Sequence, residues 1–171
     1  METTTTDRPA LDPLQLRAAF GQFPTGVTVI TACAADGRKV GLTANSFSSL
    51  SLDPPLVLFC LAKKAHLATV IHSATGFSVN FLTQDQQDLS TYFAGMWKEP
   101  TPPPFTFEAW EGGPKLAGVG AAMGCAMETI HEGGDHFIVV GRVLALYRHE
   151  PVPPPLVFHS GRYASLAETA V

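Results

Sequence analysis

The 171-residue sequence is poor in charged residues, and this shortage limits what the protein can bind. Charged side chains make up 15% of the residues, compared with roughly 25% in an average soluble domain. The formal net charge of −4 supplies no basic field for a phosphate backbone, so we expect no nucleic-acid partner. Apolar residues make up 46%, which allows a sizeable core and excludes global disorder. So few charges also favour an apolar face that buries against a partner subunit.

Cysteine and long apolar runs are scarce as well. The three cysteines, Cys33, Cys60 and Cys125, are widely spaced and include no Cys-x-x-Cys pair, so we expect neither a disulfide framework nor a metal site. No apolar run approaches the ~20 residues that span a bilayer. Residues 1–7 also lack the basic and apolar regions of a signal peptide. We therefore expect a cytoplasmic protein with no membrane partner.

Glycine (15 residues) and proline (14 residues) are frequent, which favours turns and short elements over long helices. Residues 1–11 are predicted to form a flexible tail, and residues 12–171 one domain. A helix is expected to begin at the N-cap Asp12, with Pro13 at its first position, and to end near Gly21. Further helices are expected at 65–72 and from Thr83 to Phe93, where Thr83 and Gln86 would form a capping box. Asp36-Gly37 is expected to form a hairpin turn between two strands. Strands are expected at 27–31, 39–44, 56–61 (fully buried), 77–81, 106–110, 124–130, 137–147 and 156–159, which together predict a mainly β barrel with a few short helices.

Two motifs resemble known binding sites but lack the necessary context. Gly118–Gly124 nearly matches a dinucleotide fingerprint, but Met123 replaces the third small residue and no βαβ unit surrounds it. His131 and His136 are five residues apart with two glycines between them, so they cannot share a helix face as zinc ligands do. We expect neither a Rossmann site nor a metal site here.

The segment 41–55, GLTANSFSSLSLDPP, leaves a strand and is dense in small hydroxyl and amide side chains. Such a segment can offer backbone N–H groups and short donors to a planar polar heterocycle or a phosphate. From composition alone, an ordinary Ser/Asn-rich loop is the more frequent explanation.

Five motifs occur in order: PTGVTVIT at 24–31, the 41–55 segment, FSVNF at 77–81, GDH at 134–136 and HSGRY at 159–163. Together they resemble the short-chain flavin reductases that serve two-component flavin-dependent monooxygenases, over residues 14–166. The resemblance implies a split β-barrel homodimer of the FMN-binding, Greek-key type, with FMN or FAD held near the subunit interface. It also implies transfer of a hydride from NADH or NADPH to flavin, and delivery of reduced flavin to a partner monooxygenase.

The resemblance also assigns the flavin-binding residues. Lys63 and Lys64 match the segment where relatives bind the flavin phosphate, although Ala65 stands where many relatives have Ser or Thr. Asn80 would approach the ribityl–phosphate side. A solvated lysine pair and a strand-end cap are the corresponding structural alternatives. The flavin ring would lie against Thr43, Ala44, Asn45, Ser46 and Phe47, with Ser49, Leu50 and Ser51 continuing that wall.

The nicotinamide side is assigned in the same way. His136 matches the histidine that relatives place beside the nicotinamide, and its catalytic role would be positional because the cofactor carries the chemistry. The residues expected to contact the pyridine nucleotide are His159, Ser160, Gly161, Arg162 and Tyr163, with interface packing as the alternative for the last two. Two other functions stay open: a flavin-binding module without reductase activity, and a flavoenzyme acting directly on an organic substrate through the loop 95–113.

Overall fold

The computed structural model describes residues 10–167, so nearly all of the tail expected at residues 1–11 lies outside the described residues. The fold is mainly β with three short helices in this part of the chain: α1 (Pro13–Phe20), α2 (Ala68–Ile71) and α3 (Gln87–Phe93). Two minor sheets contain β1 (Thr25–Gly26) with β11 (Val157–His159) and β12 (Arg162–Ala164), and β7 (Phe107–Glu108) with β8 (Lys115–Leu116). The main sheet contains β2 (Thr28–Cys33), β3 (Lys39–Ala44), β4 (Ser48–Leu52), β5 (Pro55–Ala62), β6 (Gly76–Phe81), β9 (Ala121–Gly133) and β10 (His136–Arg148).

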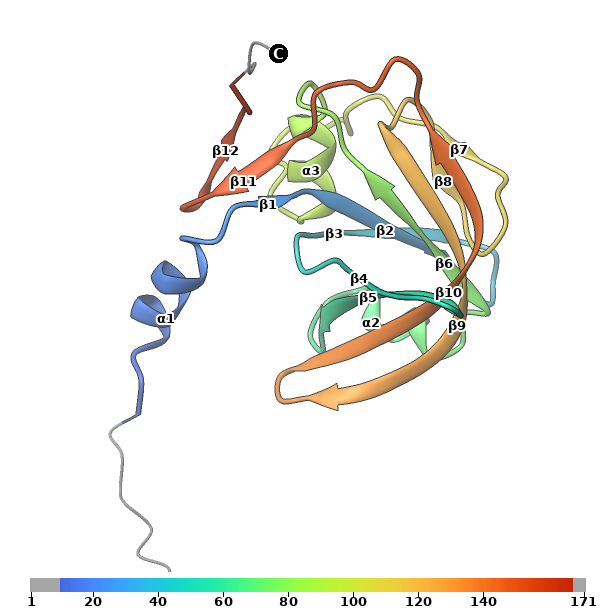
Figure 1. Cartoon of the computed structure of the whole chain (residues 1–171), viewed down its shortest axis with the longest axis horizontal. Helices are drawn as coiled ribbons and strands as arrows, with labels where there is room; N and C mark the ends of the chain where they lie inside the picture. Colours follow the sequence, from blue (N-terminus) through green and yellow to red (C-terminus); the bar gives the residue numbers. More distant parts are fainter. Residues whose placement is uncertain (1–9, 168–171) are drawn as a thin grey trace, which may run out of the picture.

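The main sheet is antiparallel, in the order β3-β2-β6-β9-β10-β5-β4, and it curls strongly (Figure 1). Its two edge strands, β3 and β4, are joined by only three residues, so Ala44 and Ser48 are at most about 14 Å apart. β3 also contacts β5 on the other side of the curl. Within residues 10–167, the sheet order pairs β3 with β2 only and β4 with β5 only, so the curled sheet stays open. We call this opening, with its connecting residues Asn45–Phe47, the seam.

The Ser46 side chain joins the seam to β5. The pairing of β4 with β5 ends at Ser48 and Leu58, so the next outward-facing backbone groups of β5 are those of Cys60. The Ser46 hydroxyl accepts a hydrogen bond from the Cys60 N–H and donates one to the Cys60 carbonyl, both at 3.0 Å. One side chain thus replaces the missing strand partner, which keeps the seam residues against β5.

Alternation along β5 shows where the core lies. Val57, Phe59 and Leu61 are buried inside the curl, and Phe59 meets Phe77 edge to face with 5.1 Å between ring centroids. Leu56 and Leu58 point to the other face and are half-buried. The expectation of a fully buried strand at 56–61 is therefore wrong. Antiparallel sheets commonly pack one face on the core and leave the other toward solvent, so the apolar residues on the second face need another explanation.

Several turn and cap predictions are confirmed. The Asp12 carboxylate accepts a hydrogen bond from the Leu14 N–H at 3.0 Å, and α1 ends before Gly21. The hairpin between β2 and β3 turns at Gly37, whose φ of 83° favours glycine. Gly118 leads into β9 and not into a helix, which confirms the exclusion of a dinucleotide fingerprint.

Other boundaries differ from the predictions. The Ser-rich segment 48–52 forms the edge strand β4, with a bulge between Ser49 and Ser51. α3 begins at Gln87. The Thr83 N–H donates to the Gln86 side chain at 3.0 Å, as in a capping box, but the Thr83 hydroxyl donates to Asp85 and does not cap the helix. The helix expected at 65–72 is regular only over α2. Among residues 10–167, no helix has the length and apolarity needed to cross a membrane.

Asn80 is a structural residue of the core. Its side chain is fully buried, and its amide donates to the Val29 carbonyl at 2.9 Å and to the Thr31 hydroxyl at 3.0 Å. Its carbonyl accepts from the Leu116 N–H at 2.8 Å. The amide therefore joins β6 to β2 and β8. This arrangement does not agree with the ribityl contact expected for Asn80. The side chain is fully buried, and its donor and its acceptor groups are already bonded to other protein groups.

We predict that Asn80→Ala lowers the free energy of unfolding by about 3 kcal/mol, because it leaves several buried groups without partners. Asn45→Ala, which removes an exposed amide, should change it by less than about 0.5 kcal/mol. Urea denaturation followed by circular dichroism measures both values. Equal stability of the two variants would contradict the structural role of Asn80.

Ser46→Ala should lower the free energy of unfolding by about 1–2 kcal/mol, since the Cys60 N–H and carbonyl lose their partner. Ser48→Ala is the matched control, because the Ser48 hydroxyl is exposed and donates only to the adjacent Ser49 carbonyl. The same denaturation experiment compares them. If Ser48→Ala cost as much as Ser46→Ala, the seam would not depend on the Ser46 hydroxyl.

Candidate functional site

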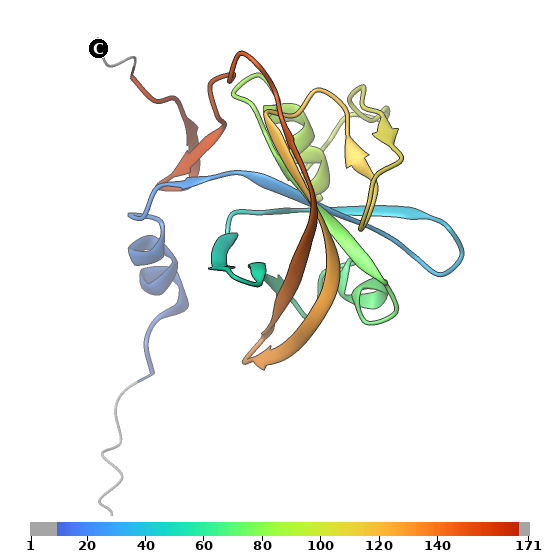
Figure 2. The ribbon, with the colours of Figure 1, turned by 45° about the vertical axis from the view of Figure 1, so that its right-hand side comes forward.

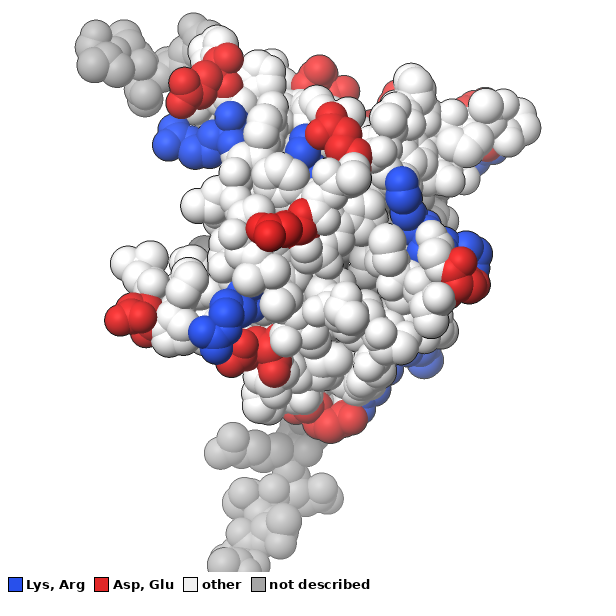
Figure 3. Space-filling model, turned by 90° about the vertical axis from the view of Figure 1, so that its right-hand side faces the viewer, with Lys and Arg blue, Asp and Glu red and all other residues white. Residues whose placement is uncertain are grey.

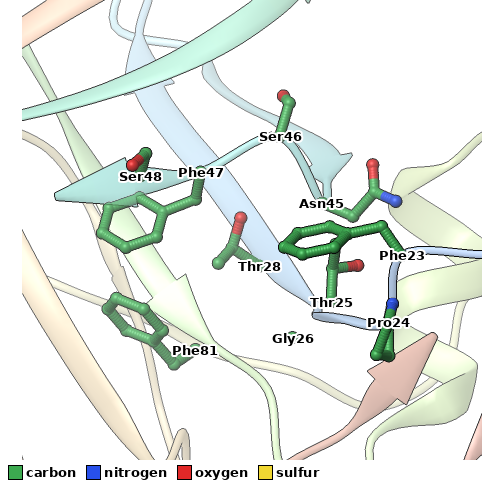
Figure 4. A pocket seen from close by; sticks show the side chains of 10 residues that line it. All are labelled: Phe23, Pro24, Thr25, Gly26, Thr28, Asn45, Ser46, Phe47, Ser48 and Phe81. Carbon is green, nitrogen blue, oxygen red and sulfur yellow. The ribbon is translucent and has the colours of Figure 1, made fainter. Parts of the chain in front are cut away.

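A cleft of about 650 Å³ opens at the seam, within the size range of small-molecule sites (Figure 4). β1 and β2 form one side, the seam residues and the start of β4 form another, and Phe81 closes the end. Phe47 packs edge to face on Phe81 with 5.0 Å between ring centroids. The lining residues are Phe23, Pro24, Thr25, Gly26, Thr28, Asn45, Ser46, Phe47, Ser48 and Phe81.

The polar groups of this cleft are short of partners. Within residues 10–167, the Asn45 side chain makes no hydrogen bond, and no main-chain hydrogen bond reaches Asn45, Ser46 or Phe47 outside the strand ladders. The Thr25 hydroxyl oxygen is buried and likewise has no partner in this part of the chain. Buried polar groups usually find a partner, so unpaired ones in a cleft indicate a ligand. Together with the rings of Phe23 and Phe47, this donor set fits a planar, polar heterocycle such as a flavin ring.

A smaller hollow of about 160 Å³ adjoins the cleft through Asn45. It contains Thr43, Phe158 and Tyr163, and the last two rings meet edge to face at 5.6 Å. The Tyr163 hydroxyl donates to the Ser90 hydroxyl at 2.8 Å, which holds β12 against α3. Tyr163 is therefore the one residue of the 159–163 motif that lines this hollow.

The rest of the 159–163 motif forms a tight hairpin beside α1. Ser160 and Gly161 have φ values of 49° and 78°, as a type I′ turn requires. The Ser160 N–H donates to the Gly21 carbonyl at 2.8 Å, and the His159 ring lies 3.3 Å from the Ser160 hydroxyl. Arg162 is exposed and forms no salt bridge with the described residues, so its guanidinium is available to an anion.

A separate polar cluster lies at the tip of the β9–β10 hairpin. The Lys63 N–H donates to the Asp135 carbonyl at 3.0 Å, and the Lys63 ammonium pairs with Glu132. The His136 ring bonds to the Asp135 carboxylate at 2.7 Å, which lowers the pKa of Asp135. This tip and the β11–β12 hairpin lie on opposite sides of the β3–β4 connection (Figures 1 and 2).

The structure thus brings together only part of the expected site. Thr43, Asn45, Ser46, Phe47 and Tyr163 line the cleft or the adjoining hollow. Ala44 is buried and contributes its carbonyl to the Thr28 hydroxyl at 2.6 Å. Ser49, Leu50 and Ser51 continue along β4 and do not line the cleft. The separate hairpin-tip cluster contains Lys63 and His136, while Lys64 is exposed without a salt bridge in the described residues.

Sequence reasoning missed several residues that line the cleft. Thr25 and Thr28 belong to the first family motif, and Phe23 directly precedes it. That motif supported the resemblance but was not assigned to the site. Ser48 was overlooked beside its neighbours, and Phe81 ends the FSVNF motif. Residues 10–167 contain no cluster of three metal-ligating side chains.

Comparisons with known proteins show the family of this chain. Residues 20–167 match the family model of the flavin reductase like domain. A probable flavin reductase from Rhizobium meliloti (strain 1021) is 46% identical over 138 residues, covering 78% of this chain and 43% of the relative. The match to a second relative from the same strain covers 58% of that relative. The chain therefore spans about half the length of these two proteins.

Two further matches cover nearly whole chains. The reductase subunit HsaB of a flavin-dependent monooxygenase from Mycobacterium tuberculosis (strain CDC 1551 / Oshkosh) is 40% identical, covering 91% of this chain and 83% of the relative. The solved structure of the Streptomyces globisporus C-1027 NADH:FAD oxidoreductase SgcE6, in complex with NAD and FAD fragments, superposes with a TM-score of 0.83. It is 36% identical and covers 96% of this chain and 100% of that one. The chain therefore belongs to the family of flavin reductase like domains.

Proposed function

We propose that this chain is an NAD(P)H-dependent flavin reductase, which transfers a hydride from NADH or NADPH to FMN or FAD. The observation that carries the proposal is the cleft at the seam, where unpaired polar groups and aromatic rings surround a space of ligand size. The reduced flavin would then pass to a partner monooxygenase, as the name of the HsaB relative suggests. Family membership over residues 20–167 supports the same activity.

A bound flavin supplies the hydride acceptor, so the protein needs to bind and align two rings and to exclude water. The main-chain N–H groups of Asn45–Phe47 and the Asn45 amide would hold the polar edge of the flavin ring. Lys63 and Lys64 would serve the flavin phosphate, although Glu132 competes for Lys63. His136 would orient the nicotinamide, and Arg162 would bind a phosphate of the pyridine nucleotide.

Anaerobic mixing of the purified protein with FMN or FAD and with NADH or NADPH tests the activity. The visible absorption of the flavin should bleach in at least one of the four combinations. Flavin binding without bleaching in any combination would contradict the reductase and favour a flavin-binding module.

His136→Ala should lower kcat/KM for the pyridine nucleotide by about 10- to 100-fold, the cost of a lost positioning contact. Its flavin Kd should stay within about twofold, because His136 lies outside the cleft. His131→Ala is the control, since His131 is an exposed histidine on the other strand of the same hairpin. Equal kinetics in both variants would remove His136 from the mechanism.

The surface supports the proposal that the chain is a split β-barrel homodimer of Greek-key type. α1 has no buried residue, and an isolated helix of eight residues is unstable in water. Its Leu14 and Phe20 side chains are 73% and 69% exposed, and Leu146 on β10 is 69% exposed. Figure 3 shows the side of the molecule that faces away from α1, and this side carries scattered charges and no continuous basic patch. A second copy of the chain would cover these apolar groups and the outer face of β5.

Sedimentation velocity should therefore give about twice the 18.2 kDa mass of one chain. Phe20→Glu should weaken the dimer at least about tenfold, since it places a charge in the apolar contact. Arg17→Glu changes an exposed polar residue of the same helix and should leave the dimer intact. A monomeric parent protein would contradict the dimer.

The three cysteines are free, which agrees with a reducing compartment. We therefore propose a cytoplasmic location.

A further inference from the structure

An ion pair at the tip of the β9–β10 hairpin joins the Lys63 ammonium to the Glu132 carboxylate. Lys63 directly follows β5, and Glu132 lies near the end of β9, so β10 separates the two residues in the sheet. The Lys63 ammonium crosses β10 at 5.3 Å from the centre of the Phe137 ring. Phe137 lies between the partners, because it is in register with Leu61 on one side and with Glu132 on the other. The ion pair therefore draws the Lys63 side chain across β10.

This direction leads away from the seam. β5 lies between β10 and β4, so the seam and the ion pair lie at opposite edges of β5. The side chains of Lys63 and Glu132 are 37% and 72% exposed. An ion pair this exposed to water is weak, so Lys63 can exchange Glu132 for another anion.

The open edge of β5 leads from the seam to Lys63. Ser46 binds both backbone groups of Cys60 at this edge, and Ala62, two residues further on, directs its N–H to the same side. Within residues 10–167, no main-chain hydrogen bond outside the strand ladders reaches the Lys64 N–H. Cys60 and Lys63 are separated by about 10 Å of nearly extended chain. The extended ribityl chain and phosphate of a flavin can cover this span from a ring at the seam.

Glu132 is the acidic side chain that competes for this cation. The other carboxylate of the hairpin tip, Asp135, is bonded to the His136 ring at 2.7 Å. Lys64 forms no salt bridge with any described residue. A phosphate that binds both lysines therefore finds Lys64 unpaired but has to displace Glu132 from Lys63.

We propose that Glu132 determines how tightly the chain holds a flavin phosphate, because it competes with the phosphate for the Lys63 ammonium. The inference rests on the proposed function, since the flavin ring must lie at the seam for its phosphate to reach Lys63. When the phosphate leaves, Glu132 takes its place, and no unpaired cation remains. Glu132 thus weakens flavin binding and speeds flavin release, which suits a protein that passes reduced flavin to another enzyme.

Equilibrium titration of the purified protein with FMN and with riboflavin, followed by flavin fluorescence, tests this inference. Glu132→Gln should tighten FMN binding about fivefold, because the exposed ion pair no longer competes with the phosphate. The riboflavin Kd should stay within about twofold, because riboflavin has no phosphate. Rapid displacement of bound FMN should give a dissociation rate about fivefold lower. An unchanged FMN Kd, or riboflavin binding that tightens as much as FMN binding, would overturn the inference.

A double-mutant cycle with Lys63 distinguishes competition from plain charge repulsion. Lys63→Gln should weaken FMN binding about tenfold, because it removes a charged phosphate ligand. Adding Glu132→Gln to Lys63→Gln should then change the FMN Kd by less than about twofold, since no ammonium is left to compete for. If Glu132→Gln tightened FMN binding just as much without Lys63, Glu132 would act by repelling the phosphate and the inference would be wrong.

Glu128→Gln is the matched control. Glu128 lies on the same strand, and its carboxylate pairs with Arg142 at 2.9 Å instead of Lys63. This variant should leave both Kd values within about twofold, and an FMN Kd that tightened as in Glu132→Gln would overturn the inference. These results would leave the proposed function intact, because the parent protein still binds flavin. A parent protein that binds neither FMN nor riboflavin would overturn the proposed function as well.

Discussion

An antiparallel sheet that curls but does not close has to accommodate two unpaired edges, and the site in this protein depends on how it does so. The connection Asn45–Phe47 joins the two edge strands directly, so the edges approach each other without forming a ladder. Ser46 satisfies the backbone of Cys60 on one side of this seam. The main-chain groups beside it have no such partner and lie at a cleft. Because the sheet does not close, the main-chain N–H groups at the seam stay available as donors, and the paired strands on either side hold them in place.

α3, the C-terminal hairpin and the β9–β10 hairpin are arranged around this open sheet. The edge of β3 that β4 does not cover lies along a second groove, and α3 borders this edge through the close contact of Phe93 with Gly41. The C-terminal hairpin attaches to α1 at Gly21 and to α3 at Ser90, which places Tyr163 next to the seam. The β9–β10 hairpin lies on the other side of the β3–β4 connection and carries His136. The C-terminal hairpin and the β9–β10 hairpin therefore lie on different sides of the seam.

Local sequence signals predicted the elements that depend on neighbouring residues. The cap at Asp12, the turn at Gly37 and the strand 39–44 follow from short-range chemistry, and the structure agrees with them. The edge strand β4 was missed because a Ser-rich segment has weak strand propensity and pairs with β5 through long-range contacts. Likewise, no local signal shows that the Asn80 side chain makes its hydrogen bonds inside the core. Nor does one show that the Thr25 hydroxyl has no partner among the described residues. The 41–55 motif contains the seam residues Asn45–Phe47, but it also contains Ser49–Ser51, which belong to β4 and do not line the cleft.

Hydrogen–deuterium exchange with and without flavin tests most directly whether the seam is the binding site. The account predicts slower exchange of the Asn45, Ser46 and Phe47 amides when flavin is added, because these N–H groups then gain an acceptor. The amides of β6, which are already paired in the core, should keep their rates. Unchanged exchange at Asn45–Phe47, with protection confined to residues away from the seam, would contradict the account.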